Sequence, residues 1–377
     1  MPYKKTRTVY DFPNVISVER QECPGGFFTP SLEDIMAQRK VVEEYFRSET
    51  VGLLLPLGSE REWNTFPQTL TYALEWGIAP ERVIVIHSPR AQAVVDRLEL
   101  KEKGCLVLNE AELLDLFDTE RIHSRFAVDM AKQRGKGRAF AMAFAYLKYV
   151  SPWKTVKDLF FLDVDANATH FQPLHYLGYA QAIFPDDKRL FLLTAQNNAL
   201  RDNHYLFVMR ESWRHESHLG RHYAAHLDQL VWSQTGEMML RWDILGEQIP
   251  FAIGYGLENS WQLFAADQVA QGSKVAQVVN PQPKRDGGQI GQSGRCYDAT
   301  MYRQLNLMAW FLIKHGKPLS QLTAEDYHAI NTHLSHTRHT VILPDNEDHG
   351  PPYRVQLQSD LFIPPLAMLA AEDCLHI

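Results

Sequence analysis

Short apolar runs recur through the first half of this chain, and the intervals between them leave room for helices. The runs occupy residues 51–57 (VGLLLPL), 82–88 (RVIVIHS), 104–110 (GCLVLNE), 157–165 (KDLFFLDVD) and 188–196 (KRLFLLTAQ). Runs this apolar are typical of strands that are covered on both faces, as in a parallel sheet. With helical patterns between them, they predict an α/β fold in which a doubly wound, mostly parallel sheet has helices on both faces.

The chain divides into parts that differ in pattern. Residues 1–48 are expected to form an N-terminal extension with a helix that Ser31 opens. Residues 49–290 hold the strand series, and residues 291–377 are expected to form a mainly helical C-terminal region. Within the strand series, RGKGRAFAMAFAYLKYV repeats apolar side chains every three to four residues, which predicts an amphipathic helix.

Composition excludes several classes of protein. A net charge of −7 argues against a nucleic-acid-binding protein, which usually carries a basic face. No apolar stretch reaches the roughly 18 residues of a membrane span. The cysteines show no CxxC spacing, which is typical of reduced thiols in a cytoplasmic protein. They are Cys23, Cys105, Cys296 and Cys374.

Two aspartates, Asp163 and Asp165, end the run at 157–165. Ligands of open α/β sheets bind beyond the carboxyl ends of the strands, so both carboxylates are expected to face a binding crevice. Residues i and i+2 of an extended segment point the same way. The pair can therefore hold one Mg²⁺ or Mn²⁺ ion, which prefers oxygen ligands and binds the phosphates of a nucleotide.

Two other interpretations of this pair stay open. In phosphatases with a DxDx(T/V) strand end, the first aspartate is a covalent nucleophile, which here would be Asp163. That motif has Thr or Val at the position that Asn167 occupies in this chain. Alternatively, the two acids only solvate the end of a strand.

The start of the predicted amphipathic helix carries Gly135, Lys136 and Arg138. Backbone N–H groups at a helix N-terminus, together with cationic side chains, form an anion site. The segment therefore predicts a phosphate cradle, although a basic helix start on the surface would have the same sequence.

The segment GYGLEN brings two glycines close to Glu258. Gly254 and Gly256 would let the backbone approach a ligand, and a carboxylate accepts hydrogen bonds from sugar hydroxyls. A tight turn before a buried helix is the alternative.

Together these segments resemble the GT-A fold glycosyltransferases, in particular the retaining synthases of the glucosyl-3-phosphoglycerate type. VGLLLPLGSE is similar to that family's first strand and loop, RGKGRA to its Gly-Lys-Gly helix start, and FFLDVDA to its metal strand. TGEMMLRWDIL, GYGLENSWQL and KVAQVVN are similar to its later segments. The resemblance spans residues 50–280 and implies a Rossmann-like GT-A domain. The C-terminal region would complete its acceptor side.

The resemblance also implies roles for individual residues. Asp163 and Asp165 would hold the metal and the diphosphate, with Asp286 as a third ligand where the family has a histidine. Glu258 would bind the donor sugar, and Lys136 would approach the nucleotide. The remaining predicted positions are the base or ribose loop (Leu57, Gly58, Ser59, Glu60), the backbone beside the sugar (Gly254, Tyr255, Gly256) and the acceptor turn (Thr235–Glu237).

The implied reaction moves a hexose from a nucleoside-diphosphate sugar to a small polar or phosphorylated acceptor such as 3-phosphoglycerate or glycerate. The cation, Lys136 and Arg138 would stabilise the leaving diphosphate, and Asp165, Glu258 and Glu237 would be the catalytic carboxylates. An inverting reaction would need a base, for which Glu237 and Asp243 are candidates. A non-catalytic sugar-nucleotide-binding protein is the alternative, and either class allows a homodimer.

Overall fold

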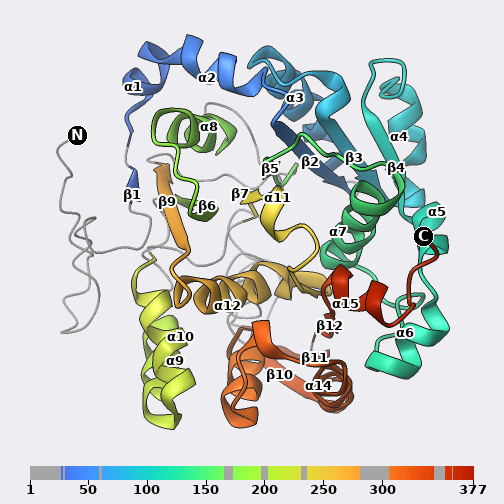
Figure 1. Ribbon diagram of the computed structural model, residues 1–377, viewed down its shortest axis with the longest axis vertical. Helices are drawn as coiled ribbons and strands as arrows, with labels where there is room; N and C mark the ends of the chain where they lie inside the picture. Colours follow the sequence, from blue (N-terminus) through green and yellow to red (C-terminus); the bar gives the residue numbers. More distant parts are fainter. Residues whose placement is uncertain are drawn as a thin grey trace.

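The computed structural model describes residues 27–28, 30–58, 62–164, 173–196, 203–230, 236–280, 305–343, 353–358 and 360–377. Its centre is an eight-stranded sheet with the order β1-β9-β6-β7-β5-β2-β3-β4 (Figure 1). The strands, in that order, are Phe27–Phe28, Lys274–Asn280, Arg189–Gln196, Met238–Arg241, Asp158–Phe161, Val51–Leu57, Val83–His87 and Leu106–Asn109.

All neighbours in this sheet run parallel except β7, which is antiparallel to both β5 and β6. The predicted strands at 51–57, 82–88, 104–110, 157–165 and 188–196 are present as β2 to β6. The prediction of a doubly wound, mostly parallel sheet is confirmed. The antiparallel strand β7 was not predicted, because MMLR is too short to show a pattern of its own.

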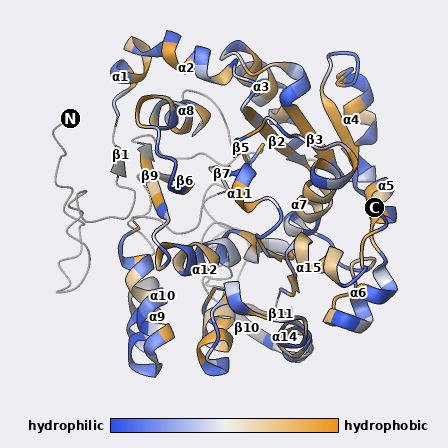
Figure 2. Cartoon of the chain, in the orientation of Figure 1, coloured by the Kyte–Doolittle hydropathy of each residue, from blue (hydrophilic) through white to orange (hydrophobic). Residues whose placement is uncertain are grey.

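Helices cover both faces of the sheet. Along β2, successive side chains pack alternately into two core clusters, one on each face. Leu53 and Leu55 pack in one core cluster with α1 (Leu32–Ala37), α2 (Arg39–Phe46), α3 (Glu62–Glu75), α4 (Gln92–Arg97) and α8 (Pro173–Ile183). Leu54 packs in the other cluster, with α6 (Thr119–Phe126), α7 (Lys136–Ala145) and α12 (Leu257–Val269). Side chains that point alternately to two covered faces explain why the strands read as continuous apolar runs. In Figure 2 the central strands β2 and β3 are mainly orange, the hydrophobic colour.

The helix α7 is buried from Gly137 to Ala145 on every side. The prediction of an amphipathic helix was therefore wrong for this stretch. Part of the cover on its outer side comes from α15 (Leu366–Ala371), in the C-terminal part, which packs against it (Figure 1). A helix covered on all sides needs no polar face.

The remaining elements lie mainly in the second half of the chain. They are α5 (Glu110–Leu113), α9 (Asn203–Glu216), α10 (His218–Asp228), α11 (Trp242–Leu245), a helix over residues 305–315, α14 (Ala324–His336) and the hairpin β10 (Arg338–Leu343) with β11 (Tyr353–Gln358). The expected C-terminal helices are thus accompanied by strands. None of the helices in the described ranges is long and apolar enough to cross a membrane.

A short strand near the C-terminus pairs with a strand about 110 residues earlier in the chain. β8 (Phe251–Ala252) pairs with β12 (Phe362–Ile363), and the Ile253 N–H donates to the Leu361 carbonyl at 2.9 Å. The buried amide of Asn331 fixes this pairing: its Nδ2 donates to the carbonyls of Phe126 and Phe362, both at 2.8 Å, and its Oδ1 accepts from the Phe362 N–H at 2.7 Å.

Replacing Asn331 by alanine is expected to lower the free energy of unfolding by about 2 kcal/mol, because buried backbone groups of α6 and β12 lose their partner. Urea denaturation measures the change. Ser335→Ala is the control, since Ser335 lies in the same helix, is only half-buried, and its hydroxyl donates to the Thr332 carbonyl one turn earlier. A change below about 0.5 kcal/mol is expected there. Equal losses in both variants would contradict this role for Asn331.

Candidate functional site

The carboxyl ends of β2, β3 and β5 lie at one edge of the sheet. Here the Ser88 Oγ donates to the Gly58 carbonyl at 3.0 Å, which joins the ends of β2 and β3. The side chain of Leu57 lies in the core, whereas Gly58 is exposed at this edge. The assignment of the Leu57–Gly58 backbone to the base or ribose stays a prediction.

Asp163 follows β5 and lies directly against Gly236. The antiparallel register pairs Phe161 with Met238, so the residues just before β7 meet the residues just after β5. A Cβ atom added to Gly236 would lie 1.8 Å from the Asp163 Oδ2. Only glycine fits at position 236 while the carboxylate keeps this place.

Lys136 joins two carboxylates from different elements. Its Nζ lies 2.5 Å from the Asp163 Oδ1 and 2.8 Å from the Glu258 Oε1. The side chains of Lys136, Asp163 and Glu258 are 21%, 24% and 8% exposed, so the cluster is partly shielded from water. Burial by itself lowers the pKa of Lys136, but the carboxylates of Asp163 and Glu258 outweigh it and raise the pKa. Position 136 therefore holds a permanent positive charge.

The start of α7 packs on the backbone of β8 and the turn η6 (Gly254–Gly256) that follows it. A Cβ at Gly137 would lie 1.8 Å from the Ala252 carbonyl oxygen, and one at Gly135 would lie 2.8 Å from the Gly254 Cα. Gly254 has φ +80°, a conformation that favours glycine. These glycines bring two chain segments into contact, which is what places Lys136 beside Glu258.

A fourth side chain, Asp360, reaches the same turn from the C-terminal part. Its Oδ2 accepts a hydrogen bond from the Gly256 N–H at 2.6 Å. Burial raises the pKa of Asp360 to about 7, the Gly256 N–H opposes this, and the charge of Glu258 adds to it. The sequence contained no signal for this residue, because a lone aspartate in SDLF matches no motif.

Two other predicted residues, Arg138 and Glu237, are buried. Arg138 is buried, and its guanidinium binds the Glu110 carboxylate at 2.7 Å and the Met130 carbonyl at 3.1 Å. Glu237 is fully buried, and its carbonyl accepts from the Thr194 N–H at 3.2 Å. The structure thus brings Asp163, Lys136 and Glu258 together but directs Arg138 elsewhere.

The suggestion of Asp243 as a base near the acceptor was wrong. Asp243 follows the end of β7, and its carboxylate binds Arg241 at 2.9 Å. Because β7 is antiparallel and Arg241 pairs with Asp158 at the start of β5, this group lies at the edge opposite Asp163.

Several predicted positions lie outside the described residues. They are Ser59, Glu60, Asp165, Asn167, Thr235 and Asp286, and of Tyr255 only the backbone is described. Within the described ranges, no group of three His, Cys, Asp or Glu side chains could hold a metal ion. Of the predicted metal ligands, Asp163 lies within the described residues, and its carboxylate lies against Gly236. A carboxylate oxygen is a suitable ligand for Mg²⁺ or Mn²⁺.

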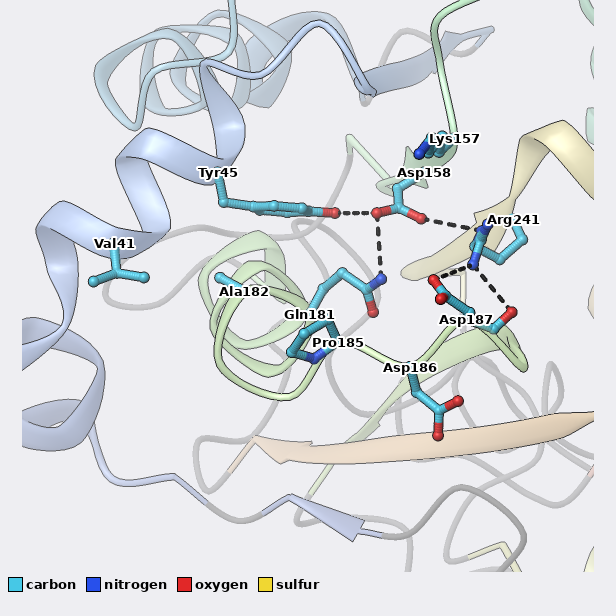
Figure 3. A pocket seen from close by; sticks show the side chains of 10 residues that line it. All are labelled: Val41, Tyr45, Lys157, Asp158, Gln181, Ala182, Pro185, Asp186, Asp187 and Arg241. Carbon is cyan, nitrogen blue, oxygen red and sulfur yellow. Dashed lines mark hydrogen bonds and ion pairs between the residues drawn. The ribbon is translucent and has the colours of Figure 1, made fainter.

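A pocket of about 210 Å³ lies at the other edge of the sheet, around the buried Asp158 at the start of β5. Figure 3 shows Tyr45, Gln181 and Arg241 converging on this carboxylate. The Tyr45 hydroxyl donates to Oδ2 at 2.6 Å, and the Arg241 Nε lies 3.6 Å from Oδ1. Ligands of such sheets bind at the carboxyl ends of the strands, so this network is better explained as an anchor between α2 and the sheet.

No protein-family model matches this chain, and no curated protein sequence matches it. It is similar to solved structures of glucosyl-3-phosphoglycerate synthase from Mycobacterium tuberculosis. The complex with Mn²⁺, UDP and phosphoglyceric acid is 16% identical and has a TM-score of 0.55, over 87% of this chain and 94% of that one. The complex with Mg²⁺ and UDP is 16% identical and has a TM-score of 0.56, over 90% and 97%.

A third complex of that enzyme, with Mn²⁺, UDP-glucose and glycerol 3-phosphate, is 16% identical and has a TM-score of 0.54, over 86% of this chain and 93% of that one. Identities this low concern the fold. The sheet, its order and these matches confirm the architecture that the motifs predicted: this chain has the GT-A fold of the glycosyltransferases, in the form seen in glucosyl-3-phosphoglycerate synthase.

Proposed function

We propose that this protein is a metal-dependent glycosyltransferase that moves a hexose from a UDP-sugar to a small, phosphorylated or polar acceptor. The observation that carries the proposal is the position of Lys136, between Asp163 and Glu258, at the carboxyl edge of the sheet. The similar solved structures hold UDP or UDP-glucose with Mn²⁺ or Mg²⁺, which supports the choice of donor and cation.

Asp163, with Asp165, would hold the cation, which when bound neutralises charge on the diphosphate. In the transfer, the bond between the anomeric carbon and the diphosphate oxygen breaks, the acceptor hydroxyl oxygen bonds to that carbon, and the hydroxyl proton passes to the departing diphosphate. Lys136 stabilises the leaving group through its charge. An ammonium has three donors, and among the described residues two carboxylates account for two of them, which leaves one for a phosphate oxygen.

Glu258 is the proposed sugar contact. Its residue is 6% exposed, and the Oε1 atom is already bound to Lys136. The second carboxylate oxygen then accepts from hexose hydroxyls, which selects a sugar over the bare nucleotide. Because one lysine links Glu258 to Asp163, sugar and diphosphate would be held by a single connected group of charges.

For the acceptor we propose 3-phosphoglycerate or glycerate, with retention of configuration. Similar structures hold phosphoglyceric acid and glycerol 3-phosphate. The acceptor side would be formed by residues 235–237 and by the C-terminal region over 291–377.

A thermal-shift series tests the proposal. UDP, GDP and ADP are each added with Mn²⁺, with Mg²⁺ and without metal to the wild type and to Asp163→Asn. We expect UDP with metal to stabilise the wild type by about 2.7 kcal/mol at one hundred times Kd, and Asp163→Asn to lose this response. Asp115→Asn, at an exposed position, is the control and should keep it. A protein that no nucleotide stabilises, or an Asp163→Asn variant with a full response, would refute the proposed function.

A further inference from the structure

The carboxylate of Asp360 lies in a space that two glycines leave free. A Cβ at Gly254 would lie 2.8 Å from the Asp360 Oδ1, and one at Gly256 would lie 2.8 Å from its Oδ2. On its other side, Gly254 meets Gly135, so the turn η6 is held between the start of α7 and Asp360. The turn therefore has a close neighbour on each of two sides, and these two contacts restrict its position.

The same carboxylate supplies what the start of α12 lacks. Gly256 is the N-cap residue of α12, and no side chain of its own can cap the helix. The Asp360 Oδ2 accepts from the Gly256 N–H, and a negative charge at a helix N-terminus is favourable. Glu258 is the second residue of this helix, so its backbone belongs to the turn that Asp360 fixes.

The segment that carries Asp360 is itself well anchored. Leu361 accepts from the Ile253 N–H, and β12 begins at Phe362, whose backbone is held by the amide of Asn331. The backbone next to Asp360 is therefore held in place by hydrogen bonds on both sides.

The charges of the neighbouring side chains also favour the observed position of Glu258. The like charge of Glu258 contributes to the raised pKa of Asp360, so the two carboxylates repel each other when both are ionised. Glu258 has a cation, Lys136, on its other side at 2.8 Å. The repulsion favours the position of Glu258 next to Lys136.

From these contacts we propose that Asp360 is a positioning residue for recognition of the donor sugar: by holding Gly256 it orients Glu258 toward the hexose. The inference rests on the proposed function. It assigns sugar selectivity to a residue that lies far along the chain from the proposed nucleotide-binding segments. It also predicts that a change at Asp360 alters the affinity for UDP-glucose but not the affinity for UDP.

Calorimetric titration of UDP and of UDP-glucose, both with Mn²⁺, tests this with the intact chain and needs no acceptor. For Asp360→Ala we expect UDP to bind as in the wild type, within about twofold, and UDP-glucose to bind about tenfold more weakly, the size expected for one lost hydrogen bond to a charged group. Asp360→Asn should recover most of this loss, because its amide oxygen still accepts from the Gly256 N–H. Asp373→Asn, at an exposed position of the C-terminal segment, is the control and should bind both ligands normally.

Glu258→Gln should show the same selective loss, and adding it to Asp360→Ala should cause little further loss if Asp360 acts through Glu258. If Asp360→Ala does not fold, Asp360→Glu replaces it, since the longer side chain has no room between Gly254 and Gly256 and must move the turn. Equal weakening of UDP and UDP-glucose, or no weakening, would overturn the inference and leave the proposed function intact. A wild type that binds neither ligand would overturn both.

Discussion

Replacing Lys136 by methionine is expected to reduce the proposed transfer reaction about 100- to 1000-fold, the size typical for loss of one preorganised electrostatic group. Methionine keeps most of the length of the side chain but removes the charged nitrogen. Asp163 and Glu258, each within 2.8 Å of the ammonium, then lose the cation between them, and the leaving diphosphate loses a donor. The measurement is the steady-state rate of UDP release from UDP-glucose in the presence of 3-phosphoglycerate and Mn²⁺.

Lys132→Met is the matched control for this variant. Lys132 lies just before the same helix, its side chain is 85% exposed, and it pairs only with Asp129 among the contacts described. We expect its rate to match the wild type. A Lys136→Met enzyme with more than about a tenth of the wild-type rate would show that the electrostatic role assigned to Lys136 is wrong.

Replacing Gly137 by alanine is expected to lower the free energy of unfolding by about 3 kcal/mol, at the upper end of the usual cost of overpacking. The added Cβ would lie 1.8 Å from the Ala252 carbonyl oxygen, and the obstacle is backbone that a side-chain rotation cannot relieve. Helix propensity alone predicts the opposite sign, a gain of up to about 1 kcal/mol for alanine inside a helix. Denaturant unfolding therefore distinguishes the close approach of α7 to β8 from an ordinary helix start.

Gly272→Ala provides the comparison. Gly272 has φ +93° but no atom within 4 Å of an added Cβ, so alanine there should cost only the left-handed backbone penalty of about 1–2 kcal/mol. A Gly137→Ala protein as stable as the wild type would mean that α7 and β8 do not approach as described.

The strands and the polar ends of the strands could be predicted because their signals are local. A strand covered on both faces reads as an apolar run, and VGLLLPL or DLFF can be recognised without knowing their neighbours. Glu258 and Lys136 could also be singled out in this way, since each lies in a short glycine-containing segment, and their roles stay predictions. Their contact with each other required the fold.

What could not be predicted depends on contacts between distant segments. The contact between Asp163 and Gly236 follows from the antiparallel pairing of β5 with β7, which cannot be predicted from the short sequence MMLR. The burial of α7 on all sides depends on several elements distant in sequence, among them β8 and α15. Arg138 forms an ion pair with Glu110 that the sequence RGKGR cannot show. Asp360 is the clearest case, because its hydrogen bond to Gly256 joins segments about a hundred residues apart, next to the pairing of β12 with β8.

The pairing of β8 with β12 also sets an order of events during synthesis. The strands β2 to β7 and the helices between them can assemble while the chain is still being made, since each neighbour is close in sequence or already present. The turn that carries Glu258 is held only after Ile363 has left the ribosome. Under the proposed function, the residues that bind the nucleotide and the contact that orients Glu258 would therefore become available at different times during synthesis.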